Sequence, residues 1–171
     1  THFTKTTGLS SNHINAIYFD ANDNAYVGTW NGLSSLKNDQ WSYLGVGNFQ
    51  DIVGELNGDL ICTVLDTGII KVNPSIPNQR QKLTNIKYCS NHKSVKDRNG
   101  TYWFPTTIHT VVRYDGINAD EILLDPVDQK NIYFDIALNP IDNTAYLATR
   151  QGIFKYDQEK FRLINGLNFD Q

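Results

Sequence analysis

The sequence repeats itself about every forty residues, and this periodicity restricts the fold more than any other feature. Four segments align on Asn/Asp/Gly turns, each followed by a run rich in aromatic and aliphatic residues. Each run ends near a threonine, at Thr29, Thr63, Thr106 and Thr149, with spacings of 34, 43 and 43 residues. A fixed period of this length is typical of repeat architectures, in which one unit cannot bury its apolar face alone.

Each repeat has the pattern of four short strands separated by turns. The first strand of the first repeat is the alternating segment 14–19, which an Asx-rich turn connects to the second strand. Third strands are expected at residues 33–37, 69–73, 111–115 and 153–157, and outer strands at residues 40–44 and 160–164. Four short antiparallel strands every forty residues are typical of a β-propeller blade. No segment combines sustained helical periodicity with capping signals, so the pattern disfavours α/β folds.

We therefore predict an all-β chain of four β-propeller blades, each a four-stranded antiparallel meander. The blades are expected at residues 12–44, 50–84, 92–124 and 133–164. Residues 1–7 align with the last outer strand, so an extra outer strand is expected there, although a packed or frayed arm is the alternative. An extra strand would indicate a slice of a longer array with unpaired edges, which two copies could cover by pairing end to end.

Four motifs in the first repeat carry a resemblance to a known family. They are Gly8–Asn12, Ile17–Asp20, Asn24–Thr29 and Asn31–Leu33. Together they resemble the two-component regulator propeller repeat, with its GLPSN-like start, a strand ending in Asp, a Gly-Asn-Leu-Trp-Ile-Gly-Thr strand and a Gly-Leu turn. The fourth repeat matches well from Asn143 to Tyr156, whereas the second and third are looser.

The resemblance implies a function. In that family the repeats build the extracytoplasmic sensor region of bacterial hybrid two-component proteins, usually with seven blades per propeller. It implies a periplasmic or extracellular sensor segment that binds a small ligand such as an oligosaccharide. Because catalytic and nucleotide-binding motifs are missing as well, we expect no catalysis and no cofactor. The four repeats here are accompanied by no kinase or DNA-binding region and by no apolar run long enough to span a bilayer.

The charge balance, the number of cysteines and the spacing of histidines argue against nucleic-acid binding, a disulfide framework and a metal site. Lys and Arg number 15 against 18 Asp and Glu, and no basic block occurs, which argues against nucleic acid as a partner. The four histidines lack metal-ligand spacing, so no metal site is expected. Cys62 and Cys89 are too few for a disulfide framework, and both a single bridge and a buried free thiol at Cys62 remain open.

In a propeller, ligands usually bind where the second-to-third strand turns and the interblade connections meet. The candidate ligand-binding residues at these turns are Trp30, Asn31, Asp66, His109, Arg150 and Gln151. The interblade segments add Asn12, His13, Asn91 and His92. An aromatic ring can stack on a sugar ring while amides and charged groups bind its hydroxyls. The alternative is that these are ordinary polar turn residues.

Catalysis receives little support from the sequence, and no catalytic residue is assigned. There is no Gly-x-Ser-x-Gly motif, phosphate loop or nucleotide fingerprint. Two other functions stay open: a structural or protein-interaction scaffold, with self-association through blade edges, and a propeller lyase or hydrolase in which His109 and Asp66 would act.

Overall fold

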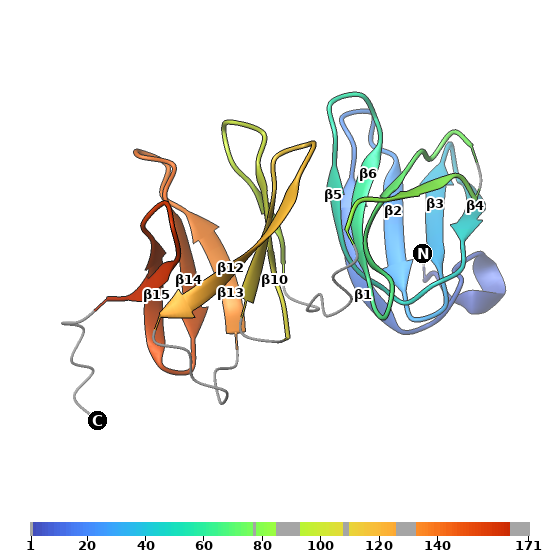
Figure 1. Ribbon diagram of the computed structural model, residues 1–171. Helices are drawn as coiled ribbons and strands as arrows, with labels where there is room; N and C mark the ends of the chain where they lie inside the picture. The colour runs from blue at the N-terminus through green and yellow to red at the C-terminus, as the bar shows by residue number, and fades with distance from the viewer. Residues whose placement is uncertain (1, 77, 85–92, 108–109, 126–132, 165–171) are drawn as a thin grey trace. The chain divides into compact units, whose positions relative to one another are not determined.

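The computed structural model describes residues 2–76, 78–84, 93–107, 110–125 and 133–164 (Figure 1). Within these ranges the regular structure is β-strand apart from one short 3-10 helix, η1, at Lys5–Thr7. This confirms the predicted all-β class. No helix in the described ranges has the length and apolar character needed to cross a bilayer.

The chain forms two compact units, Thr1–Asn91 (unit 1) and His92–Gln171 (unit 2). Unit 1 contains two antiparallel four-stranded sheets, each with its strands in chain order. The first sheet consists of β1 (Ile14–Phe19), β2 (Ala25–Thr29), β3 (Leu33–Lys37) and β4 (Gln40–Gly45). The second consists of β5 (Phe49–Gly54), β6 (Leu60–Val64), β7 (Gly68–Val72) and β8 (Arg80–Lys82).

Unit 2 contains one eight-stranded sheet in the order β13-β14-β15-β16-β12-β11-β10-β9. Its first meander is β9 (Val95–Lys96), β10 (Tyr102–Pro105), β11 (Thr110–Tyr114) and β12 (Ala119–Asp125). Its second is β13 (Tyr133–Leu138), β14 (Ala145–Thr149), β15 (Gly152–Tyr156) and β16 (Phe161–Leu163). Sequence analysis predicted that these two meanders form separate sheets. Instead, their outer strands β12 and β16 pair in parallel, with Leu124 opposite Phe161, and join the two meanders into one sheet.

The first strand carries a β-bulge at the same place in three of the repeats. It lies between Ile14 and Ala16 in β1, between Phe49 and Asp51 in β5, and between Tyr133 and Asp135 in β13. A bulge shifts one strand by a residue relative to its partner, so it fixes the register on both sides. The repeats can therefore be superimposed residue by residue, with Ile17, Ile52 and Ile136 in equivalent positions.

This register agrees with the sequence alignment at Thr29, Thr106 and Thr149 and corrects it at Thr63. The hydroxyls of Thr29, Thr106 and Thr149 donate to the carbonyls of Gly32, Thr110 and Gly152 at 3.0, 2.9 and 3.0 Å, closing the next turn. In the second repeat Val64 occupies this position, because Val64 pairs with Gly68 across a turn one residue longer. Thr63 lies inside the strand instead.

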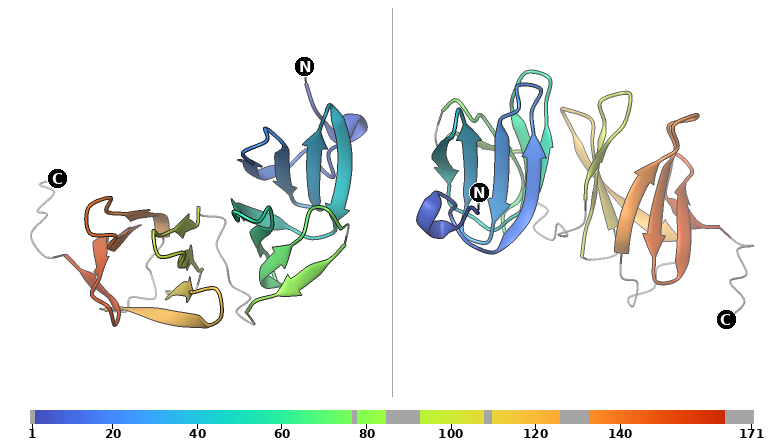
Figure 2. Two further views of the ribbon diagram at one scale, coloured as in Figure 1. Left: turned by 90° about the horizontal axis from the view of Figure 1, so that it is seen from above. Right: turned by 180° about the vertical axis from the view of Figure 1, so that it is seen from behind.

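Each unit has its own apolar core. The view from above in Figure 2 shows the two sheets of unit 1 facing each other, and their facing sides bury the core. This core contains Tyr26, Leu33, Leu44, Phe49, Ile52, Leu60, Cys62, Val64, Ile70 and Val72.

Cys62 is a free thiol, and its burial raises its pKa. Cys89 lies outside the described residues. In unit 2 the core contains Trp103, Val111, Ile122, Leu124, Ile136, Ala145, Leu147, Phe154 and Phe161.

The N-terminal segment does not form the expected extra outer strand. Residues 5–7 form the helix η1, which is capped by reciprocal hydrogen bonds between Thr4 and Thr7. The segment packs on the first sheet: the Phe3 ring lies edge-on to Trp41 at 5.3 Å, and Ser10 bonds to Thr29 and Ser34. Local threonine capping thus replaces strand pairing in this segment, and it forms a packed arm.

Candidate functional site

Two stacked rings, Trp30 and His13, lie at the turn between β2 and β3; we call this pair the aromatic platform. The Trp30 indole is 54% exposed and stacks on the His13 imidazole, with ring centroids 4.2 Å apart and planes 11° from parallel. The Trp30 amide also donates to the His13 carbonyl at 3.2 Å. Because Thr29 accepts bonds from the amides of Asn31 and Gly32, the turn holds the indole in place. His13 covers one face of the ring, and the rest is available to a ligand.

A cluster of side-chain amides lies at the same end of unit 1. Asn15 donates to the Asn48 side-chain oxygen at 3.0 Å and to the Phe49 carbonyl at 2.8 Å, which links the starts of β1 and β5. Gln50 donates to the same Asn48 oxygen. All three amides are half-buried, so part of each remains accessible. Sequence analysis missed them, although a polar residue beside a bulge in an otherwise apolar strand is a usable signal.

Asp66 belongs to the same end of unit 1. It lies in the turn between β6 and β7 with a positive φ of 61°, and this turn is tied to the start of β5 by the bond from Leu65 N to Asn48 O, 2.9 Å. The structure therefore brings the predicted residues Trp30, Asn31 and Asp66 to one end of one unit. We call this surface the turn face of unit 1; it comprises His13, Asn15, Trp30, Asn31, Asn48, Gln50 and Asp66.

The other predicted residues do not belong to this surface. Arg150 and Gln151 are exposed at the turn between β14 and β15, the equivalent position in unit 2, where the Gln151 amide donates to Thr149 Oγ1 at 3.1 Å. Asn12 uses its side-chain oxygen to accept a bond from the Lys5 amide at 2.7 Å, a structural role. His109, Asn91 and His92 lie outside the described residues.

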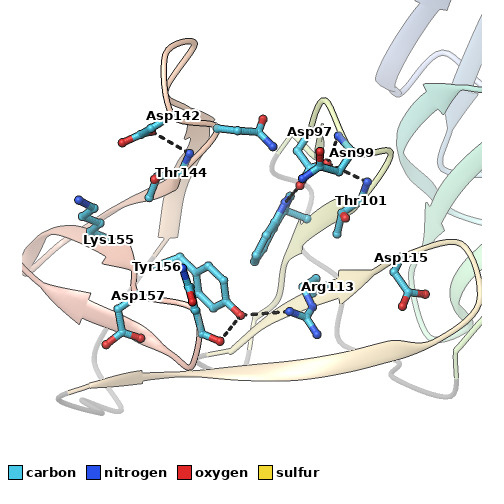
Figure 3. Close-up of a pocket in the computed structure, with 13 residues that line it drawn as sticks. Asp97, Asn99, Thr101, Arg113, Asp115, Asp142, Thr144, Lys155, Tyr156 and Asp157 are labelled. Carbon is cyan, nitrogen blue, oxygen red and sulfur yellow. Dashed lines mark hydrogen bonds between the residues drawn. The ribbon is translucent and has the colours of Figure 1, made fainter.

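Unit 2 contains a second candidate site, a pocket of about 750 Å³ between its two meanders (Figure 3). It lies at the end of the strands opposite the β14–β15 turn, where the other turns of these meanders carry Asp and Asn. It is lined by Asp97, Asn99, Thr101, Trp103, Arg113, Asp115, Asp142, Asn143, Thr144, Lys155, Tyr156, Asp157 and Gln158. None of these residues is among the candidate site residues of the sequence analysis.

The carboxylates of this pocket also hold the turns. Asp115 accepts from the amides of Ile117 and Asn118 at 2.8 and 2.7 Å, and Asp142 accepts from the Thr144 amide at 3.0 Å. Because a bound amide favours the ionised form, these bonds lower the pKa of both carboxyls. Such groups stay charged at neutral pH, so they are acceptors for ligand hydroxyls and poor general acids.

The charged and polar side chains of the pocket contact two aromatic residues, Tyr156 and Trp103. The Arg113 guanidinium donates to Asp120 at 2.8 Å and to the Tyr156 hydroxyl at 3.1 Å, and the bond to Asp120 raises its pKa. Figure 3 shows Arg113 pointing toward Tyr156. The Tyr156 ring meets Trp103 edge-on at 4.8 Å. Among the described residues, no group of three or more His, Cys, Asp or Glu side chains is arranged to hold a metal ion.

Sequence comparison assigns the first repeat. Residues 8–31 match the profile of the family described as "Two component regulator propeller". Residues 8–31 are therefore similar to one repeat of this family. The matched segment contains His13, Asn15, Trp30 and Asn31, so it includes both rings of the aromatic platform. No curated protein sequence matches the chain.

Solved structures share the fold of this chain. The extracellular domain of a putative hybrid two component system from B. thetaiotaomicron is 16% identical with a TM-score of 0.70, covering 91% of this chain and 24% of that one. Virginiamycin B lyase from Staphylococcus aureus is 14% identical with a TM-score of 0.70, covering 87% and 54%. An auxiliary nutrient binding protein from Bacteroides ovatus is 19% identical with a TM-score of 0.64, covering 88% and 41%. The chain thus spans a quarter to about half of these structures.

Asp157 provides a test of the turn electrostatics. Its carboxylate accepts from the amides of Glu159 and Lys160 and from Arg162, which lowers its pKa to about 2. A lowered folded-state pKa contributes stability above pH about 4 that is lost as the pH falls toward 2. We expect carboxyl NMR titration to place Asp157 near 2 and Arg162→Gln to raise that value. Arg150→Gln is the control; titration of wild-type Asp157 near 4 would contradict the geometry.

Proposed function

We propose that the chain is a segment of the extracytoplasmic sensor propeller of a bacterial two-component system, and that the turn face of unit 1 binds a neutral oligosaccharide. The observation that carries the proposal is the regulator-propeller repeat at residues 8–31, which holds the Trp30–His13 platform. The likeness to the extracellular domain of a two-component system supports the same role and location. We interpret the four meanders as four blades, two of which are joined by pairing between their outer strands β12 and β16.

The chemistry of the turn face suits an uncharged sugar. The exposed face of Trp30 offers a flat apolar surface on which the C–H face of a sugar ring can stack. The half-buried amides of Asn15, Asn48 and Gln50 both donate and accept hydrogen bonds, as sugar hydroxyls do. The one carboxylate of the surface, Asp66, adds a strong acceptor at its edge. No cation belongs to the turn face as defined, so anionic sugars would lack a partner there.

We further propose that this segment binds without catalysis. The turn face offers an imidazole at His13 that already stacks on Trp30, and its carboxylate belongs to a different turn. In unit 2 the lowered pKa values of Asp115, Asp142 and Asp157 disfavour a carboxylic acid as proton donor. The printed similarity to a lyase makes turnover worth measuring in the same experiment.

The test is calorimetry of the chain against a panel of neutral oligosaccharides, followed by the Trp30→Ala variant. Removal of an aromatic anchor typically costs more than 1–2 kcal/mol, so we expect binding to weaken by roughly 10- to 30-fold. Trp30→Phe keeps a ring and should retain most of the affinity. The control is Ile76→Ala, an exposed apolar residue between β7 and β8.

Three outcomes would overturn the proposal. Binding that survives Trp30→Ala unchanged would place the ligand elsewhere, and the absence of binding across the panel would favour a structural or protein-interaction scaffold. Conversion of a bound sugar, detected by chromatography of the ligand after incubation, would contradict the non-catalytic role.

A further inference from the structure

An apolar stripe on strand β1 has no partner in the described structure. Ile14, Ile17 and Phe19 are 40%, 61% and 59% exposed, although all three belong to the edge strand of the first sheet. The alternate residues Ala16 and Tyr18 pack on the core of unit 1. Large apolar residues exposed side by side on a strand are unusual for a surface that faces only water.

The second repeat shows what these positions do when they have a partner. By the shared bulge, Ile14, Ile17 and Phe19 are equivalent to Phe49, Ile52 and Gly54. Phe49 and Ile52 are 0% and 6% exposed, and a Cβ placed on Gly28 would lie 3.1 Å from Phe49 Cβ and 3.3 Å from Ile52 Cδ1. At Gly54 the backbone comes so close that a Cβ would collide with Tyr18.

These positions are therefore the ones through which one sheet packs on the sheet before it. Unit 2 supports this: Ile136, the equivalent of Ile17, is 2% exposed within a core shared by both meanders. The contact also shows which surface receives these residues: β5 packs against β1 and β2 around Gly28. The unpartnered stripe on β1 thus has the shape and polarity to dock on another repeat of the same kind.

The same chain presents the complementary surface on its last sheet. By register, Ala137, Tyr146 and Ala148 are equivalent to Tyr18, Tyr26 and Gly28. Tyr26 is 2% exposed, whereas Ala137 is exposed and Tyr146 and Ala148 are only half-buried in the described structure. Strand β15 adds Ile153, half-buried, at the position of the fully buried Leu33. This receiving surface is apolar, as the one around Gly28 is.

We propose that the β1 stripe of one copy docks on the β13–β14 surface of a second copy, reproducing the contact between β5 and the first sheet. The contact is head to tail, because it joins two different surfaces of one chain. It can close into a ring or extend, depending on the rotation that it imposes. The proposal is independent of the oligosaccharide site, since it uses neither Trp30 nor any other residue of the turn face.

The first test is the mass of the full chain in solution, by light scattering after size exclusion over a range of concentrations. We expect masses above the 19.4 kDa of one chain, reaching at least a dimer. Ile17→Asp should return the chain to a monomer, because a buried unpaired charge opposes docking. Ile141→Asp, at an 87% exposed residue of the β13–β14 turn, is the matched control. A wild-type monomer at every concentration would overturn the proposal.

A second variant protects the test against a folding artefact. Ala148→Arg changes the receiving surface instead of the stripe and should also give a monomer, with a circular dichroism spectrum like that of the wild type. The proposal would be overturned if Ile17→Asp and Ala148→Arg both still assembled. It would also be overturned if the Ile141→Asp control lost assembly together with them.

Cross-linking tests the direction of the contact. Ile14 and Ala148 are equivalent to Phe49 and Gly28, and a Cβ placed on Gly28 would lie 3.1 Å from Phe49 Cβ. After a small shift, this separation suits a disulfide. In a Cys89→Ser background, Ile14→Cys chains mixed with Ala148→Cys chains should form a covalent dimer on oxidation. Neither variant alone should do so. A covalent dimer of Ile14→Cys with itself, or none in the mixture, would contradict a head-to-tail contact.

Discussion

Replacement of Phe49 by alanine is expected to lower the free energy of unfolding of unit 1 by about 3–5 kcal/mol. The ring is fully buried between the two sheets of unit 1, where its Cβ faces Gly28 and the Arg80 guanidinium lies 5.5 Å from its centroid. The bulge at Phe49 pins the strand, so the backbone cannot easily collapse into the space left by the ring. A loss of this size is a large part of the stability of an ordinary domain.

The measurement is urea unfolding followed by tryptophan fluorescence, in which Trp30 and Trp41 report unit 1 and Trp103 reports unit 2. Leu56→Ala removes a fully exposed apolar side chain from the same unit and should change stability by less than about 0.5 kcal/mol. A loss below about 1 kcal/mol for Phe49→Ala would mean that the two sheets do not pack as described.

Replacement of Trp103 by alanine is expected to have a comparable effect on unit 2, about 3–5 kcal/mol. The indole is 4% exposed and lies edge-on to Tyr156 and Phe161, at 4.8 and 6.0 Å, so it joins the two meanders. Its N–H donates to the Asp97 carboxylate at 3.3 Å. Loss of the ring would therefore leave a cavity in the core of unit 2 and remove one of the side chains that line the pocket.

Trp103→Phe separates these two contributions, because it keeps an aromatic ring and removes only the N–H donor and part of the volume. We expect it to cost about 1–2 kcal/mol, as for one lost hydrogen bond with partial repacking. Unfolding is followed by far-ultraviolet circular dichroism, since the variants lack the tryptophan of unit 2. Ile117→Ala, at an 86% exposed turn residue, is the control. Equal costs for both substitutions would show that the hydrogen bond, and not the ring, holds the meanders together.

The candidate site could be predicted only in part. Turn chemistry identified Trp30, Asn31 and Asp66, which the structure places at one end of unit 1. The same reasoning selected Arg150 and Gln151, which belong to unit 2, and His109, which lies outside the described residues. The sequence did not indicate the Asn15–Asn48–Gln50 cluster or the stacking of His13 on Trp30, because both depend on contacts between different strands and turns.

The sequence by itself determined the β class, the forty-residue repeat and the strand order within each meander. These features depend on alternation and turn residues within a few positions of each other, so local chemistry is sufficient. Only the tertiary structure decided that β12 pairs with β16, that the N-terminal segment packs as an arm and that the pocket of unit 2 lies between two meanders. Those features depend on which surfaces meet after each meander has formed, and packing between distant segments selects them.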